Sequence, residues 1–268
     1  MFNLIHRQAV YLKSLSALAL VSEKEFRTIP QLSIQNIGLS SVILMGMYRR
    51  LLVDAFNSMT KSPGVLPGDI ILFTHDDNDH FSPDALPDIR GTDSSIIGPP
   101  TIVKPLLEKE RATLDQINVL YSVDNTNPAS IELGGMRIHC YHTQHFNNWD
   151  PVHNSYLIEH GETRIYISGD SVYSKELADT VGSTDAIICN IVEEGMLRGQ
   201  TPEHIALHHC LSDLLHLQAI SRTKLIIGVH LLEFPRAVDA KKLKALISEN
   251  GFTGITIPVS TGEVIPVV

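Results

Sequence analysis

Short apolar runs separated by polar turns dominate the chain and predict two blocks of β-strands. In the first block, alternating or continuous apolar positions predict strands at residues 31–37, 41–45, 50–55 and 69–73. In the second block, similar runs predict strands at residues 118–122, 130–133, 136–141, 155–159, 163–168, 185–192 and 224–229. Residues 252–268 are expected to end the chain in β-structure. The run at 69–73 is apolar throughout, as in a strand buried on both faces.

Helical segments are expected outside both blocks. The pattern predicts an amphipathic N-terminal helix within residues 1–30 and further helices at residues 106–118, 202–220 and 241–249. Two strand blocks with helices outside them predict layers in the order helix, sheet, sheet, helix, which is a four-layer αββα sandwich of the α/β class. No linker interrupts the pattern, so we expect residues 1–268 to form one domain.

Composition and charge narrow the classes of partner. The 268 residues include 21 Lys and Arg against 30 Asp and Glu, a formal net charge of −9. Nucleic-acid binding depends on clustered basic residues, so we expect a small-molecule substrate rather than a nucleic acid. No apolar run approaches the roughly 18–20 residues that span a bilayer, and we expect no membrane association. The apolar run at residues 14–22 is short and charged residues follow it, which favours a packed helix over a secretory signal. Three cysteines are too few for a disulfide framework and indicate the cytoplasm. The sequence leaves open whether the protein forms a homo-oligomer.

Groups that can bind metal follow four of the predicted strands. His75-x-Asp77-x-Asp79-His80 comes directly after the strand at 69–73, and His142-x-x-His145 follows the strand at 136–141. Asp170 follows the strand at 163–168, and His230 follows the strand at 224–229. A single histidine after a strand is more often an ordinary surface residue, and acidic loops are often solvated turns. Four such groups in order, each at the end of a strand, predict a metal centre.

With these motifs in place, the sequence resembles the metallo-β-lactamase superfamily from about residue 31 to residue 230. The resemblance is carried by three segments: ILFTHDDNDHF, similar to the family's Thr-His-x-His-x-Asp-His loop; SVILMGMYRRLLVDAF, similar to its opening hairpin that ends in Asp; and YLIEHGETRIYISGDS, similar to its Gly-Asp strand. The last segment resembles in particular the branch that includes ascorbate-6-phosphate lactonases. The family implies a hydrolase that uses two neighbouring divalent metal ions to activate water.

Carried over residue by residue, the resemblance implies two metal sites. His75, Asp77 and a histidine of the third element would bind the first ion, and Asp79, His80 and His230 the second, with Asp170 between them. His145 is preferred to His142 as the third-element ligand, because it begins a loop at about the family's usual distance before the Gly-Asp strand. Asp77 departs from the family, which usually has histidine there. Zn²⁺ is the expected ion, and the added carboxylate moves preference toward Mn²⁺ or Fe²⁺.

Two residues are candidates for proton transfer. Asp79 is placed to accept a proton or orient the attacking water. The segment around His204, HIALHHCL, is similar to a histidine-bearing helix start in phosphodiesterase and RNA-processing branches, where the histidine acts as a general acid near the leaving group. The alternative for His204 is an ordinary polar helix face. The function expected is hydrolysis of a small ester, lactone or phosphodiester. A nuclease or RNA-processing enzyme on the same fold and a non-catalytic metal-binding domain are the alternatives.

Overall fold

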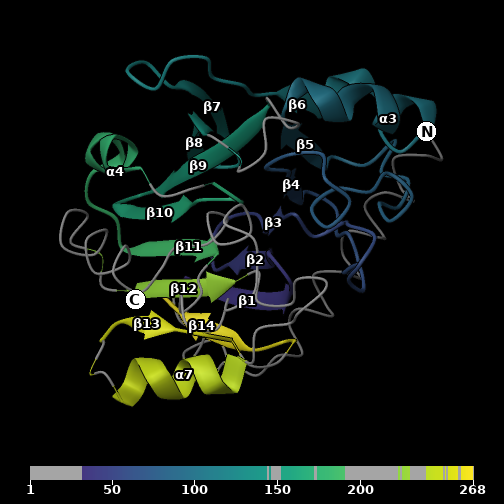
Figure 1. Ribbon diagram of the computed structural model, residues 1–268. Coiled ribbons are helices and arrows are strands. Elements are labelled where there is room, and N and C mark those ends of the chain that lie inside the picture. Colours follow the sequence, from purple (N-terminus) through teal and green to yellow (C-terminus); the bar gives the residue numbers. More distant parts are fainter. Residues whose placement is uncertain are drawn as a thin grey trace.

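Two β-sheets make up most of the structure, which is a computed structural model (Figure 1). The structure describes residues 32–143, 145, 152–171, 174–190, 223, 225–229, 240–249, 251, 253–258 and 261–267. The first sheet has the spatial order β14 (Val264–Pro266), β1 (Ser33–Gly38), β2 (Ser41–Met45), β3 (Leu51–Val53), β4 (Ile70–Leu72), β5 (Ser95–Gly98) and β6 (Ile117–Val119). The second has the order β13 (Ile255–Thr256), β12 (Leu225–Val229), β11 (Ala186–Asn190), β10 (Thr163–Ile167), β9 (His153–His160), β8 (Met136–Thr143) and β7 (Ala129–Leu133).

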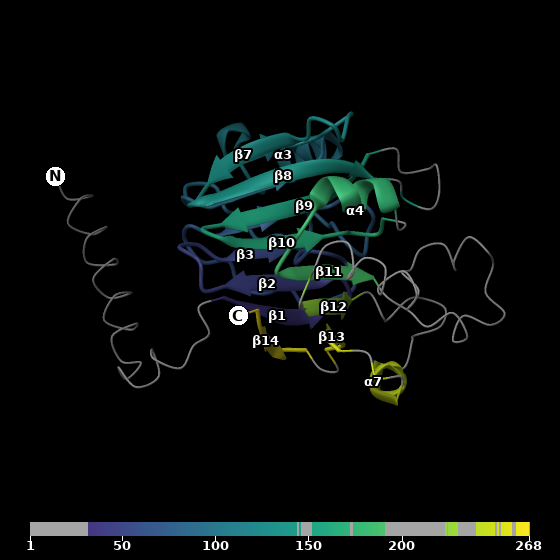
Figure 2. The same cartoon turned by 90° about the vertical axis from the view of Figure 1, so that its left-hand side faces the viewer.

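Helices flank the paired sheets. Helix α3 (Val103–Glu108) lies beside β5 and β6, α4 (Lys175–Val181) lies outside the second sheet, and α7 (Ala240–Glu249) lies beyond β13 (Figure 1). Figure 2, turned by 90°, shows the second sheet in front of the first, with α4 in front of both. The arrangement confirms the predicted αββα sandwich.

Alternation along the first sheet divides its apolar residues between two cores. Ile70 and Leu72 of β4 join the core between the sheets, where Tyr156 and Ile158 of β9 lie opposite them. Ile71 and Phe73 point the other way, into a second core formed with α3 and the loops on the outer face. Both faces of β4 are therefore buried, as its continuous apolar run predicts.

Most predicted strands are confirmed, and one predicted helix is wrong. Residues 106–118 do not form one helix: α3 ends at Glu108, a 3₁₀ turn follows at Leu114–Gln116, and β6 begins at Ile117. The break has two local causes. Glu110 adopts a left-handed φ of 53°, which a continuing helix cannot contain. Thr113 and Gln116 form a capping box that starts the new turn.

One described strand and one described α-helix were not predicted, and two predicted helices lie outside the described residues. Strand β5 and helix α4 were missed because both are short. The helices predicted within 1–30 and at 202–220 fall on residues that the structure does not describe, and they stay predictions. None of the helices in the described ranges combines the length and apolar composition that crossing a membrane requires.

Strand direction places the ends of many strands at one edge of the sandwich. Strands β3, β4, β5 and β6 are parallel to one another, so the segments that follow them start at the same edge. In the second sheet, β10, β11 and β12 are parallel, and β9 is antiparallel to both β8 and β10. The ends of β8 and β10 therefore lie together with the beginning of β9. This edge carries the candidate metal ligands.

A buried tyrosine ties the two sheets together close to that edge. The Tyr156 hydroxyl donates to the Phe73 carbonyl at 3.0 Å and accepts a hydrogen bond from the Asn154 side-chain amide at 2.9 Å. Tyr156→Phe should lower the free energy of unfolding by about 1–3 kcal/mol, because it leaves the buried carbonyl without this donor. Urea unfolding measures the change. Tyr48→Phe, at a side chain 87% exposed, is the control and should change stability by less than about 0.5 kcal/mol. Equal effects of the two substitutions would contradict this account.

Candidate metal centre

Thr74, the second residue after β4, is hydrogen-bonded through its N–H, its hydroxyl and its carbonyl. The Thr74 backbone N–H donates to Asp54 Oδ1 at 2.9 Å, and its hydroxyl lies 2.8 Å from Asp54 Oδ2. The Thr74 carbonyl accepts from the Asn154 N–H at 3.1 Å, which joins the loop to the first residues of β9. The Asp77 carbonyl then accepts from the N–H groups of His80 and Phe81, at 2.9 and 2.8 Å, and closes the turn. His75 and His80 are thereby held on a rigid segment.

The buried carboxylate of Asp54 sets the tautomers of both histidines. Its Oδ2 accepts from His80 Nδ1 at 2.9 Å, so Nδ1 carries the proton and His80 Nε2 faces the site. Because the Thr74 hydroxyl donates to Asp54, its lone pair accepts from His75 Nδ1 at 2.9 Å, and His75 Nε2 faces the site too. Asp54 itself has a φ of 47°, a conformation that Asp tolerates better than most residues. The family resemblance includes the hairpin that ends in Asp54, but sequence reasoning gave this side chain no role.

Side-chain nitrogen and oxygen atoms converge in two groups at this edge. One group contains His75, His145 and Asp170, and the other contains Asp79, His80 and Asp170; within each group the ligand atoms lie within 4.8 Å of one another. Asp170 belongs to both groups, and its Oδ2 lies 3.2 Å from His80 Nε2 and 4.0 Å from His145 Nε2. With Asp77, whose Oδ2 lies 3.7 Å from His75 Nε2, the structure brings together six of the seven residues predicted as ligands.

Asp77 lies beside the first group. Its Oδ2 is 3.7 Å from His75 Nε2 and 3.9 Å from His145 Nε2, and its side chain is 48% exposed. Asp79 and Asp77 are separated by one residue in the loop, and Asp79 Oδ2 lies 3.8 Å from His80 Nε2. The two carboxylates therefore approach different imidazoles from one loop.

An isolated β-bridge brings the third element to Asp170. His145 pairs with Ser171 beyond the end of β8, so its imidazole lies next to the turn after β10. His142 is placed differently: it belongs to neither ligand group, its ring contacts Tyr121 at a centroid distance of 6.1 Å, and its backbone is bonded to Asn125. His145 therefore lies in a group of candidate ligands and His142 does not, and the choice of His145 as the ligand stays a prediction.

A further imidazole that sequence reasoning missed lies in the cluster. The fully buried ring of His153, the first residue of β9, is 4.7 Å from the His75 ring and 5.4 Å from the His145 ring, between centroids. Its position opposite Thr143 in the β8–β9 pairing places it at the same sheet edge. His153 begins a strand that pairs with the end of β8, and the predicted ligand His145 follows β8. This position is the signal that could have identified His153.

Burial and neighbouring charges shift the pKa values of the histidines in opposite directions. Desolvation, with the nearby imidazoles of His80 and His153, lowers the pKa of His75 well below its ordinary value. Desolvation also lowers the pKa of His153, to about 3, against the attraction of Asp170. At His80 the same desolvation is outweighed by the carboxylates of Asp170 and Asp54, which raise its pKa well above the ordinary value. The neutral ring of His75 leaves the lone pair of its Nε2 available.

The donor set fits a pair of divalent ions. His75 Nε2 is fully buried and has no hydrogen-bond partner among the described residues, although a buried polar atom normally has one. The imidazole nitrogens of His75, His80 and His145, together with carboxylates from three aspartates, form a ligand set suited to Zn²⁺, Mn²⁺ or Fe²⁺. His230 and His204 lie outside the described residues, so their positions relative to the cluster stay predictions.

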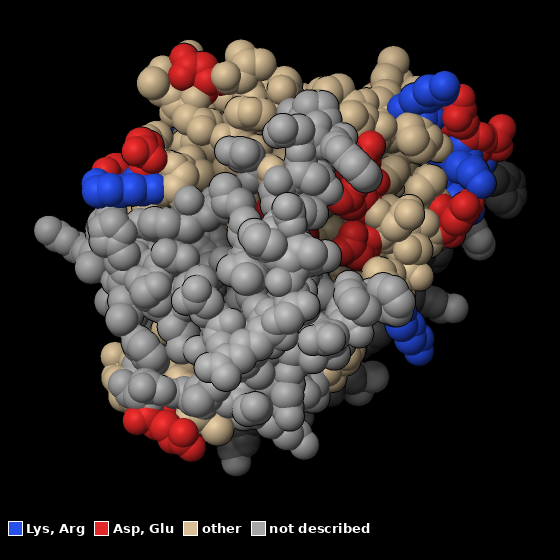
Figure 3. All heavy atoms as spheres, viewed as in Figure 1, with Lys and Arg blue, Asp and Glu red and all other residues tan. Residues whose placement is uncertain are grey.

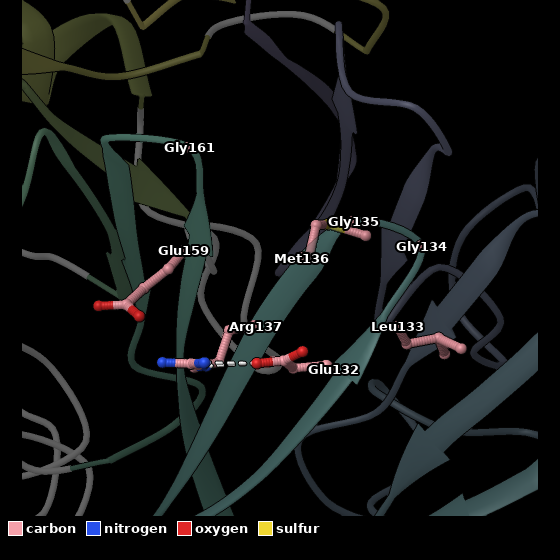
Figure 4. Close-up of a pocket in the computed structure, with 8 residues that line it drawn as sticks. All are labelled: Glu132, Leu133, Gly134, Gly135, Met136, Arg137, Glu159 and Gly161. Atoms are coloured by element: carbon pink, nitrogen blue, oxygen red, sulfur yellow. Dashed lines mark hydrogen bonds and ion pairs between the residues drawn. The ribbon is translucent and has the colours of Figure 1, made fainter.

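A separate pocket of about 430 Å³ lies at the other end of the second sheet, between the β7–β8 and β9–β10 turns (Figure 4). Its charged side chains are already paired: Arg137 binds Glu132, and Glu159 binds His139 and Arg164. It lies at the start of β8, whereas the His and Asp cluster lies beyond the end of that strand. The pocket is therefore not part of the candidate metal centre.

Comparison with known proteins agrees with this fold. A family model described as "Beta-lactamase superfamily domain" matches residues 49–230. A search of curated proteins found no match. Among solved structures, a possible metal-dependent hydrolase from Veillonella parvula is similar with a TM-score of 0.65 at 16% identity, over 87% of this chain and 98% of that one.

Two further structures are similar to a comparable degree. The isothiocyanate hydrolase from Delia radicum gut bacteria has a TM-score of 0.64 at 17% identity, over 87% of this chain and 98% of that one. CmlA, a diiron β-hydroxylase from Streptomyces venezuelae, has a TM-score of 0.63 at 16% identity, over 95% of this chain and 59% of that one. At these identities the likeness shows the fold. Because the family model spans more than half of the chain and the two-sheet architecture agrees with it, the protein belongs to the β-lactamase superfamily and has the metallo-β-lactamase fold.

Proposed function

We propose that this protein is a hydrolase that uses two divalent metal ions to cleave a small ester, lactone or phosphodiester. The observation that carries the proposal is the position of Asp170, whose carboxylate belongs to both groups of converging ligand atoms. A carboxylate shared by two neighbouring sets of imidazole and carboxylate ligands suits a two-metal centre. The family match and the solved structures named as hydrolases support the same reaction class.

Each ion would have its own ligands in addition to Asp170. His75, Asp77 and His145 would hold the first ion, and Asp79 and His80 would hold the second together with His230. Bound divalent ions would acidify a water molecule and polarise the bond under attack. The chain's own groups fix the geometry, because the Asp54 and Thr74 hydrogen bonds direct Nε2 of both loop histidines toward the cluster.

Asp79 is the proposed proton acceptor. Its side chain is 29% exposed, whereas the His80 ring beside it is fully buried, so the carboxylate lies at the boundary between the cluster and solvent. A carboxylate there can take a proton from water at one oxygen while the other approaches His80. His204 is proposed to protonate the leaving group, as the family resemblance implies.

Charge favours a small substrate over a nucleic acid. On the face shown in Figure 3, the described Lys and Arg side chains lie toward the margins, mostly beside acidic side chains. The chain's net charge of −9 gives no general attraction to a polyphosphate backbone. Within the small-molecule class we propose a lactonase-like or phosphodiesterase-like reaction, on the resemblance of the Gly-Asp strand to the ascorbate-6-phosphate lactonase branch.

The proposed metal is Zn²⁺, with Mn²⁺ and Fe²⁺ as the ions that Asp77 favours. Three imidazole rings suit zinc, whereas three aspartates make the ligand set harder than one with histidine at position 77. A diiron enzyme among the structural neighbours supports testing iron as well.

The reaction class is tested by a substrate panel. Protein purified without chelator is reloaded separately with Zn²⁺, Mn²⁺ or Fe²⁺ and assayed on lactones, phosphodiesters and thioesters. Turnover of at least one class that chelator abolishes and metal restores would support the proposal. Fully loaded protein that turns over nothing in the panel would count against it and favour a non-catalytic metal-binding domain.

Asp77 gives a prediction about metal content. Asp77→Ala should remove one metal equivalent or sharply weaken its binding, because it deletes the carboxylate beside His75 and His145. Asp77→His should keep both equivalents and shift preference toward zinc, since imidazole suits that ion. Elemental analysis of each variant, with Zn²⁺ and Mn²⁺ in competition, measures both effects. Asp76→Ala, at the exposed neighbouring residue, is the matched control. Unchanged metal content in Asp77→Ala would place Asp77 outside the ligand set.

Asp79 gives a prediction about turnover. Asp79→Asn keeps the size and one oxygen but loses the charge that accepts a proton, so it should lower kcat by about 10²–10⁴-fold. Some metal should remain bound, because His80 and Asp170 are intact. Steady-state kinetics and metal analysis on the same preparation separate the two effects, with Asp76→Asn as the control. A kcat within a factor of three of the wild type would remove Asp79 from the proton-accepting role.

A further inference from the structure

His153 lies within the cluster of imidazoles but outside both groups of converging ligand atoms. Its ring is fully buried, and both of its nitrogens have partners in the protein. Nδ1 lies 2.6 Å from the Thr143 hydroxyl oxygen, and Nε2 accepts a hydrogen bond from the Asp170 backbone N–H at 2.9 Å. A lone pair that accepts from an amide is not available to a metal ion.

The hydrogen bonds fix one tautomer of His153. A backbone N–H can only donate, so Nε2 must carry the lone pair and the ring proton must be on Nδ1. Nδ1–H then donates to the Thr143 hydroxyl oxygen, and that hydroxyl can donate in turn to the His153 carbonyl, 3.4 Å away. The chain of bonds runs from the end of β8 through the first residue of β9 to the turn after β10.

The turn after β10 leaves space for this contact only because residue 169 is glycine. Gly169 has a φ of 56°, which residues with a side chain rarely adopt. A Cβ there would lie 2.9 Å from His153 Nε2 and 3.1 Å from Thr74 Cβ. The glycine before Asp170 therefore permits both the turn and the close approach of the imidazole.

We infer that His153 is a positioning residue, which holds the Asp170 backbone so that the Asp170 carboxylate reaches both metal sites. The inference deepens the proposed function and rests on it, since Asp170 is the group shared by the two sites. Without the hydrogen bond from its amide to His153, the turn at residues 169–170 keeps the bridge between Ser171 and His145 but loses its anchor to β9. The backbone that carries the shared carboxylate would then lose this restraint.

Metal binding by two variants tests this role. His153→Leu removes the acceptor and keeps an apolar group of moderate size, and it should weaken the binding of Zn²⁺ by about 10–100-fold at one site or more, the usual effect of losing a residue that orients a ligand. His153→Gln places an amide oxygen near the position of Nε2 and should restore most of the affinity. Isothermal titration with Zn²⁺ measures both. The matched control is His139→Leu, since His139 lies in β8 and is bonded to Glu159, away from the cluster; it should bind Zn²⁺ as the wild type does.

A second measurement uses the wild-type protein and does not depend on a variant folding. In protein loaded with Cd²⁺ and labelled with ¹⁵N-histidine, the ligand nitrogens of His75, His80 and His145 should show scalar coupling to ¹¹³Cd, and His153 should show none. His153 should instead have the Nδ1–H tautomer with and without metal. Coupling between ¹¹³Cd and His153 would make it a ligand and overturn the inference.

The outcomes separate this inference from the function on which it rests. If wild-type protein and His153→Leu bind Zn²⁺ equally, the positioning role is wrong and the two-metal proposal stands. If His153→Gln loses as much affinity as His153→Leu while both remain folded by circular dichroism, the hydrogen-bond account is wrong. If wild-type protein binds neither Zn²⁺ nor Cd²⁺, the proposed function fails, and the positioning role fails with it.

Discussion

The Asp54 carboxylate is buried at the end of β3, and its hydrogen bonds hold the histidine loop in place. It accepts from the Thr74 backbone, the Thr74 hydroxyl and His80 Nδ1, and through Thr74 it also orients His75. A buried carboxylate is stabilised only when such donors surround it. The same bonds therefore satisfy Asp54 and direct two imidazole nitrogens toward one point. Without this carboxylate, His80 Nδ1 would lose its charged acceptor, and the Thr74 hydroxyl that orients His75 would lose its own acceptor.

The centre combines imidazoles with an unusual number of carboxylates. Asp77, Asp79 and Asp170 all approach the cluster, so three negative charges would face the four positive charges of two divalent ions. Histidine at position 77 would leave one more unit of positive charge. A more nearly neutralised pair of ions attracts an anionic substrate less strongly and prefers harder metals. We therefore propose that Asp77 affects which metal binds and how strongly an anionic substrate is attracted. Asp170 and its partner His153 would set the positions of the ligands.

Local patterns in the sequence were sufficient for most of the strands and for the six candidate ligands that the structure brings together. The motif at His75–His80 follows the strand at 69–73 closely, so strand direction indicates the sheet edge at which its side chains lie. The roles of Asp54 and His153 depend on contacts between segments that are distant in the sequence. Asp54 lies 20 residues before Thr74 and 26 before His80. His153 is bonded to Asp170, and the rest of β9 and the whole of β10 lie between them in the sequence. No local pattern encodes such contacts. The helix predicted at 106–118 was wrong because apolar spacing continues across the break at Glu110, where backbone conformation decides the structure.

The central claim is that Asp170 is shared by two metal ions. Anomalous diffraction from crystals of protein purified without chelator and loaded with Zn²⁺ or Mn²⁺ tests it most directly. The account predicts two anomalous peaks about 3.5–4 Å apart, one beside His75, Asp77 and His145 and the other beside Asp79 and His80, with the Asp170 carboxylate in contact with both. Loaded crystals with a single peak remote from Asp170, or with no peak at these residues, would contradict it.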